Sequence, residues 1–279
     1  MNFGEGRWTL GALYGEAELR YDLPLELPLL GTVDFPLYET GAAGGVQLGY
    51  GFTDSLSVAF TLGYLDTDIS IDSEFLSRLP EALRPDLNVE LRRLTFDLKF
   101  DTRDDTFYPS GGIAASASLT HAAEVDSLFD RHIDIGDRDY IKTSASLSGY
   151  RAVGEDGVLA ANASACAVGD DAPFFDQCGV GHSDSLRGFA SLENLSSHSE
   201  AAQVEYRGRL SPRWGYVAFV GGGAGGDSFS DLSSDRGGAA AGLGLRFRLS
   251  RQFKLDYAAD WAMNDQGDHQ LYLTLGQRF

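Results

Sequence analysis

Apolar and polar residues alternate along much of this chain, and many of the polar positions are charged. In 93–100 the apolar positions are Leu94, Phe96, Leu98 and Phe100, and the intervening ones are Arg93, Thr95, Asp97 and Lys99. Successive side chains of a β-strand point to opposite faces of its sheet, so such a strand has one apolar and one charged face. A soluble β-sandwich rarely buries so charged a face. A β-barrel in a membrane, with lipid outside and a polar lumen, requires it.

The composition favours a barrel and excludes other classes. No apolar run approaches the roughly 20 residues of a membrane-spanning helix, so a chain of this kind enters a membrane only as a barrel. Its 34 Gly and 8 Pro suit many strands with small inward-facing residues. The net charge of −19 argues against a nucleic-acid partner. The start, Met1–Arg7, lacks the basic and apolar stretches of a signal peptide, which indicates either a removed signal or an excised domain.

About twelve segments have the length and alternation of a tilted transmembrane strand. They are 7–22, 39–52, 55–70, 88–101, 111–122, 139–152, 157–168, 199–211, 214–226, 238–249, 252–263 and 269–279. Sixteen strands are the alternative, and they would leave only about 17 residues for each strand and its connection. We therefore favour twelve.

The connections between these segments alternate in length. The long ones include 23–38, 71–87, 123–138 and 169–198, and the tight ones include 53–54, 212–213 and 250–251. Outer-membrane barrels have long external loops, short periplasmic turns and an even number of strands. We therefore expect an all-β fold, a closed antiparallel transmembrane β-barrel that forms one domain over residues 1–279, with both ends of the chain in the periplasm.

Two segments stand out from the alternation. Asp101-Thr-Arg-Asp-Asp105 is followed by Pro109-Ser-Gly-Gly112 in the longest tight connection, and Leu186-Arg-Gly-Phe189 lies in the longest external loop. They resemble signature motifs of the bacterial surface-antigen superfamily, whose outer-membrane barrels include assembly factors of the BamA and TamA type. The turn motif consists of Asp101, Arg103, Asp104, Pro109 and Gly112. Taken alone, it also fits a purely structural turn, because Asp accepts backbone N–H bonds and Gly admits positive φ.

The resemblance implies that loop 169–198 folds into the lumen and that Arg187 at its tip pairs with acidic wall residues. A buried guanidinium needs such partners, because desolvating an unpaired charge is costly. Asp256 and Asp260 alternate with the apolar residues of their strand, so both point inward. Relatives carry an acid on the second strand after the loop, where this chain has Gly221. We therefore predict Asp256 as the preferred partner of Arg187.

The last predicted strand has an apolar face that ends in an aromatic residue. Its members are Leu271, Leu273, Leu275 and Phe279, with Gln277 on the same face. An amphipathic strand with a final aromatic residue resembles the signal by which outer-membrane barrels are handed to their assembly machinery. A final strand that happens to end in Phe is the simpler alternative.

The two cysteines are expected to form a disulfide. Cell-envelope compartments are oxidising, so Cys166 and Cys178 most simply pair, with two separate thiols as the alternative. Cys166 lies near the outer end of a predicted strand, and Cys178 begins the approach to the tip of loop 169–198. A bond between them would attach the loop to the wall and contribute roughly 3 kcal/mol.

By resemblance, the chain would insert or translocate client proteins at the outer membrane without enzymatic chemistry. Its partners would be outer-membrane lipid, lipopolysaccharide and unfolded outer-membrane protein clients, and its oligomeric state stays open. We expect no cofactor and no metal: the five histidines are scattered, and His182-Ser-Asp-Ser185 places neighbours on one loop, where they seldom form a triad. The alternative is a stand-alone passive channel or structural barrel, since no periplasmic client-capture domain is visible.

Overall fold

The computed structural model describes residues 2–3, 6–27, 31–71, 86–125, 138–181, 186–190 and 194–279, which form an all-β fold. Its long strands are β2 (Trp8–Leu27), β3 (Gly31–Gly51), β4 (Leu56–Ile71), β5 (Asp86–Asp101), β6 (Gly111–Glu124), β7 (Asp139–Val153), β8 (Gly157–Val168), β11 (His198–Arg209), β12 (Trp214–Gly226), β13 (Ser233–Ser250), β14 (Leu255–Asn264) and β15 (His269–Leu275). The short elements are β1 (Asn2–Phe3), β9 (Cys178–Gly179), β10 (Leu195–Ser196) and the 3-10 helix η2 (Phe174–Asp176). Within these described ranges, no helix is long and apolar enough to cross a membrane.

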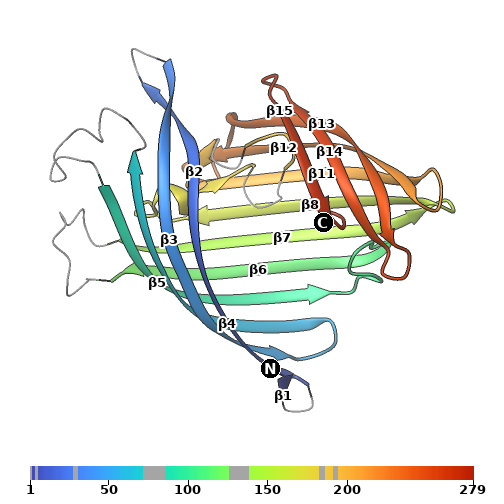
Figure 1. Cartoon of the computed structure of the whole chain (residues 1–279), viewed down its shortest axis with the longest axis horizontal. Coiled ribbons are helices and arrows are strands. Elements are labelled where there is room, and N and C mark those ends of the chain that lie inside the picture. Colours follow the sequence, from blue (N-terminus) through green and yellow to red (C-terminus); the bar gives the residue numbers. More distant parts are fainter. Residues whose placement is uncertain are drawn as a thin grey trace. The chain divides into compact units, whose positions relative to one another are not determined.

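The twelve long strands and β1 follow one another in a single sheet order, from β1 to β15, and β9 pairs with β10 outside it (Figure 1). Strands that are neighbours in the sheet are also neighbours in the chain, apart from the step from β8 to β11 across the loop that contains β9 and β10. For the described residues, the prediction of about twelve antiparallel strands is confirmed, and the alternative of sixteen is not. Each of the twelve predicted spans overlaps one of the long strands.

The first hairpin differs most from its prediction. A loop was expected at 23–38, but β2 and β3 continue through much of that range and pair from Trp8 opposite Tyr50 to Leu27 opposite Gly31. The leucines of 23–27 alternate with other residues, so the strand pattern persists beyond the predicted end. Pro24 does not end β2, because only the two-residue β1 lies beyond it in the sheet order and proline is tolerated in edge strands.

The chain divides into two compact units. The first comprises Met1–Phe52, Val58–Asp97 and Leu119–Ile141, and the second comprises Thr53–Ser57, Leu98–Ser118 and Lys142–Phe279. In the first unit the polar face is joined across strands by side-chain hydrogen bonds, such as Gln47 to Thr61 and Thr95 to Thr120. All of the site residues predicted from the sequence belong to the second unit.

The strands of the second unit have two chemically opposite faces. One face exposes large apolar side chains, among them Val220, Leu243, Leu245, Tyr257, Trp261, Leu271 and Leu273. The other face buries charged and polar side chains, among them Gln203, Glu205, Arg207, Arg246, Asp256 and Asp260. Residues of the two faces alternate along β11 and β14, as the pattern in the sequence predicted. We call these the apolar face and the charged face.

The end of β15 departs from the sequence prediction. β15 stops at Leu275, and Gly276 adopts a φ of +88°, a conformation that favours glycine. The chain therefore changes direction, and the Gln277 side chain bonds to Arg246 and Asp256 on the charged face. Phe279 follows it, with its ring 5.9 Å from the Arg187 guanidinium. The prediction that Gln277 and Phe279 share the apolar face of Leu271, Leu273 and Leu275 is wrong.

Candidate functional site

The loop tip Leu186–Phe189 packs against the charged face of the second unit. Leu186 and Phe189 form an apolar cluster with Val180, Ala201 and Ala240. At Gly188 the φ of +113° and the closeness of Ala240, whose Cβ would lie 2.6 Å from an added Cβ, both require glycine. The Gly188 N–H donates to the hydroxyl of Tyr272 on β15 at 2.9 Å. Packing and backbone geometry thus fix the tip before any charge is considered.

Arg187 lies at the centre of this contact and is fully buried. Its Nη2 donates to Glu205 on β11, and its Nη1 donates to Asp260 on β14 at 2.6 Å. Its Nε donates to Gln203 Oε1 at 3.2 Å, and the guanidinium lies 3.5 Å from the ring centroid of Phe219. A guanidinium has N–H donors along its edges and a planar face that can stack on an aromatic ring. Here the donors bond to Glu205, Asp260 and Gln203, and the face lies over Phe219. The buried charge is therefore compensated by two acids from different strands.

Each of the two acids also pairs with an arginine of the wall. Arg207 Nε donates to Glu205 at 2.5 Å, and Arg246 donates to both carboxylate oxygens of Asp260. Arg207 also donates to the backbone oxygen of Phe279 at 2.5 Å. We call Arg187, Gln203, Glu205, Arg207, Arg246 and Asp260 the loop-tip cluster. Each of the two acids therefore has one arginine partner from the loop and one from the wall.

Glu205 was not among the predicted partners of Arg187. The family pattern places the acid on the second strand after the loop, at Gly221, whereas Glu205 lies on the first strand and stands opposite Phe219 in the strand register. Gly221 has no room for an acid, because an added Cβ would lie 2.6 Å from Leu186 Cδ1. The signal was present: Gln203, Glu205 and Arg207 alternate with apolar residues on the strand that follows the loop.

Asp256, the predicted partner of Arg187, is occupied elsewhere. It accepts from Arg209, from Arg248 Nε at 2.5 Å and from Gln277 Nε2 at 3.0 Å. We call these four residues the strand-end cluster. Asp256 and Asp260 share a face of β14, but they are four residues and so about 13 Å apart along the strand, beyond the reach of one arginine head. Arg187 therefore contacts Asp260, and the preference for Asp256 was wrong.

The turn between β5 and β6 satisfies its polar groups locally. Asp101 pairs with Arg103 at 2.6 Å, and Asp104 accepts from the Ser110 and Gly111 amides at 2.8 and 3.1 Å. Partial burial raises the pKa of Asp104, but these bonds outweigh it and hold the pKa below its usual range. Pro109 is buried, and Gly112 has a φ of +98°. The motif thus forms a self-contained turn.

The same turn also reaches the strand-end cluster. The ring of Tyr108 lies 4.6 Å from the Arg209 guanidinium and 5.2 Å from that of Arg248. Asp105 pairs with Lys254 at 3.4 Å. Cations above a tyrosine ring are attracted by its negative face. The turn therefore touches the two arginines that hold Asp256, and nothing in these contacts involves the loop tip.

A disulfide joins the base of the loop to the wall. Cys166 on β8 is bonded to Cys178 on β9, twelve residues later. Lys142 on β7 donates to the Asp176 backbone oxygen at 2.7 Å and pairs with its carboxylate at 3.2 Å. The loop is therefore fixed at its base as well as at its tip. The candidate catalytic group at 182–185 lies outside the described residues.

A sheet with an apolar outer face and a charged inner face is the architecture of an outer-membrane β-barrel. Residues 36–279 match the family model described as the Omp85 superfamily domain, and the chain belongs to this superfamily. A comparison with curated protein sequences gave no match.

Three solved structures share the fold. BamA from Haemophilus ducreyi lacking POTRA domains 1–3 has a TM-score of 0.61 at 13% identity, over 97% of this chain and 62% of that one. CdiB from Acinetobacter baumannii has 0.61 at 13%, over 97% and 47%, and CdiB from Escherichia coli has 0.56 at 16%, over 97% and 50%. This chain thus spans between about half and three fifths of their lengths. At this identity the likeness establishes the fold alone.

Proposed function

We propose that this barrel inserts or translocates client proteins at the outer membrane, through strand pairing and without enzymatic chemistry. The observation that supports it is the docked loop tip: Arg187 bonds to Glu205 and Asp260 on the charged face of an Omp85 superfamily fold. Packing, a disulfide and buried ion pairs hold this loop at once.

The docked loop would act as an internal brace. Arg187 connects β11 to β14, and the amide of Gly188 adds β15 through Tyr272. These bonds run across the strands, in addition to the backbone bonds between neighbours. A wall held this way would stay together while an edge of the sheet exchanges its partner. A client strand could then pair with that edge, since exposed backbone groups there are a template for an incoming strand.

The lengths of the connections support an orientation of the barrel. Tight turns such as that after Arg209 would face the periplasm together with both ends of the chain, and loop 169–198 would enter the lumen from the external side. Partners in this arrangement are unfolded outer-membrane proteins, membrane lipid and lipopolysaccharide. The periplasmic side is where clients would arrive.

A liposome assay tests this function. The purified protein is placed in vesicles, a urea-denatured outer-membrane barrel is added, and the protease-protected folded client is measured. We expect insertion well above that of empty vesicles, and a several-fold loss with Arg187→Ala. Arg236→Ala is the matched control, because Arg236 pairs with Asp227 at the surface and both side chains are exposed.

Folding of each variant is checked first by its resistance to unfolding in SDS at room temperature. A folded wild-type protein with no insertion activity would reject the proposal. Large, steady conductance in planar bilayers that Arg187→Ala does not change would instead support a passive channel.

A further inference from the structure

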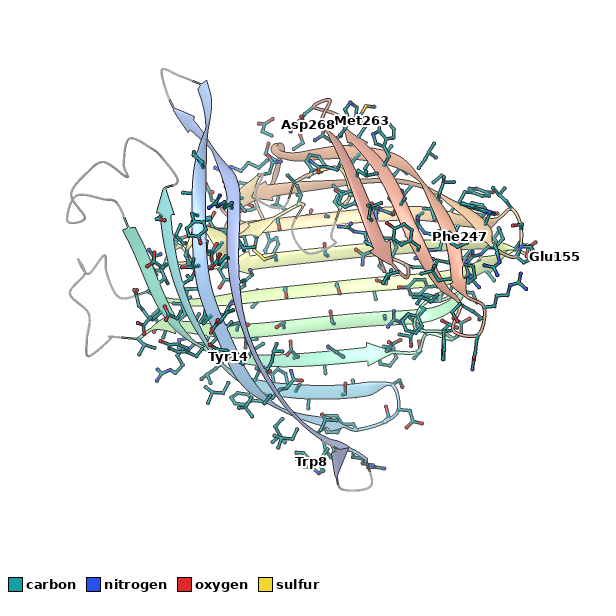
Figure 2. All side chains as sticks on the ribbon, viewed as in Figure 1. Trp8, Tyr14, Glu155, Phe247, Met263 and Asp268 are labelled. Atoms are coloured by element: carbon teal, nitrogen blue, oxygen red, sulfur yellow. A yellow bond between two sulfur atoms is a disulfide. The ribbon has the colours of Figure 1, made fainter. Side chains whose placement is uncertain are left out.

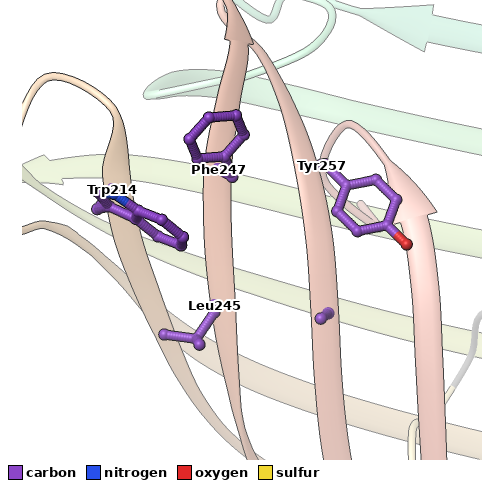
Figure 3. A pocket seen from close by; sticks show the side chains of 5 residues that line it. Trp214, Leu245, Phe247 and Tyr257 are labelled. Atoms are coloured by element: carbon purple, nitrogen blue, oxygen red, sulfur yellow. The ribbon is translucent and has the colours of Figure 1, made fainter.

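An apolar groove lies on the outer face of β12, β13 and β14. Its volume is about 420 Å³, and Trp214, Leu245, Phe247, Tyr257 and Ala259 line it (Figure 3). Trp214 stands opposite Phe247, and Phe247 stands opposite Tyr257 in the strand register, so three rings form a row across three strands. The ring centroids of Trp214 and Phe247 are 5.0 Å apart. The groove is therefore an aromatic and apolar surface formed by three strands, and such a surface suits contact with an acyl chain.

Two cations lie at the end of these strands that carries the groove. Arg213 immediately precedes Trp214, and its carbonyl accepts from the Arg248 amide at 2.8 Å, which places it beside Phe247. Arg251 lies in the turn that follows β13. Both arginines are exposed, and neither forms an ion pair within the part of the chain that the structure describes. Positive charge at this edge contrasts with the net charge of −19.

The groove and the cations complement the two halves of a lipid. Aromatic residues concentrate where a barrel meets the membrane–water boundary, so the ring row marks the level of the headgroups. Arginines just beyond that level attract anionic headgroups electrostatically. Lys254 in the same turn already pairs with Asp105, which leaves Arg213 and Arg251 to recognise a ligand.

We propose that this groove binds a phospholipid with an anionic headgroup. One acyl chain lies over Leu245 and the rings of Trp214 and Phe247, and the phosphate contacts Arg213 and Arg251. The site rests on the proposed orientation, because the tight turns then face the periplasm and the phospholipid leaflet of the outer membrane. The proposed lipid site therefore lies on β13 and β14, which also carry Arg246 and Asp260 of the loop-tip cluster.

Tryptophan quenching by brominated lipids can test the site. The chain has three tryptophans, so Trp8→Phe with Trp261→Phe leaves Trp214 as the only reporter. The vesicles consist of phosphatidylcholine and a varied mole fraction of a second lipid with brominated acyl chains. This brominated lipid is either phosphatidylglycerol or phosphatidylcholine. We expect half-maximal quenching at a roughly 25-fold lower mole fraction of brominated phosphatidylglycerol than of the brominated neutral lipid. The double variant Arg213→Ala, Arg251→Ala should abolish this difference and retain the quenching.

Trp261 supplies the matched control on the same strand. It is exposed on the apolar face near the end of β14 opposite to the groove, next to Met263, which Figure 2 labels far from Phe247. A protein with Trp261 as its only tryptophan should be quenched equally by both brominated lipids. If Trp261 is quenched and Trp214 shows no headgroup preference, the lipid site is rejected while the barrel stands.

Two other outcomes are also decisive. Quenching of neither tryptophan would contradict a lipid-facing position of β14 and with it the proposed barrel function. A headgroup preference at Trp214 that survives removal of both arginines would overturn the assignment of the phosphate to Arg213 and Arg251.

Discussion

The loop-tip cluster and the strand-end cluster lie on the same charged face, yet they are built differently. Asp256 in the strand-end cluster is held by Arg209 and Arg248, which come from strands of the wall and remain 14% and 12% exposed. Arg187 in the loop-tip cluster comes from a loop and is fully buried. Its partners Glu205 and Asp260 are almost completely buried. Backbone register positions the first set, whereas the second depends on the loop being docked. We therefore expect a substitution in the loop-tip cluster to lower the free energy of unfolding more than one in the strand-end cluster.

Removal of Arg187 should have the largest effect. Arg187→Ala deletes charge-assisted bonds to Glu205 and Asp260 in a site without water access, so we expect the free energy of unfolding to fall by about 3 kcal/mol. It is measured by urea titration in phosphatidylcholine vesicles. Arg187→Lys should recover only part of the loss, because an ammonium cannot bond two acids and Gln203 in the same plane. Full recovery by Lys would show that only the charge matters.

Loss of the disulfide should come next. Cys166→Ser with Cys178→Ser frees the base of the loop but leaves its tip bonded, and we expect a loss of about 3 kcal/mol or slightly less. Urea titration of the wild type with and without reductant gives the same comparison without a substitution. An unchanged stability in both experiments would mean that the tip contacts alone hold the loop.

Substitution in the strand-end cluster should cost less. Asp256→Asn leaves Arg209 and Arg248 without their anion, but both are partly exposed, and water can replace part of what is lost. We expect a decrease of about 1–2 kcal/mol in the free energy of unfolding. A loss as large as that of Arg187→Ala would contradict the contrast between the two clusters.

The turn motif should give the smallest effect, and it depends on pH. The pKa of Asp104 is lowered from 3.8 in the folded state, so the contribution of this carboxylate is fully present above that value and is lost as the pH falls through the folded pKa. Thermal unfolding midpoints of the wild type should therefore fall as the pH is lowered below about 4, and Asp104→Asn should weaken this fall. Parallel pH profiles for the two proteins would reject the role of Asp104.

The sequence predicted the parts of the site that depend on period two. The alternation along the strand predicts that Asp256 and Asp260 point inward, and the family resemblance predicts Arg187 as the loop residue that pairs with them. Neither pattern predicts which acid lies at the same height as the loop tip. The choice of partner depends on strand register and on packing. Here Leu186 fills the space beside Gly221, so no acid fits at that position, and the acid that bonds to Arg187 is Glu205 on the neighbouring strand. The predicted position of Phe279 was wrong because the positive φ of Gly276 ends the alternation of the strand.

The most direct test of the docked loop is a double-mutant cycle between Arg187 and Glu205. Arg187→Ala, Glu205→Gln and the double variant are compared with the wild type by their free energies of unfolding in vesicles. Direct bonding predicts that the single losses are not additive, with a coupling of about 1–3 kcal/mol. Arg187 and Arg236, which pairs with Asp227 at the surface, form the control pair and should be additive within about 0.5 kcal/mol. Additivity of Arg187 with Glu205 would contradict the docked arrangement.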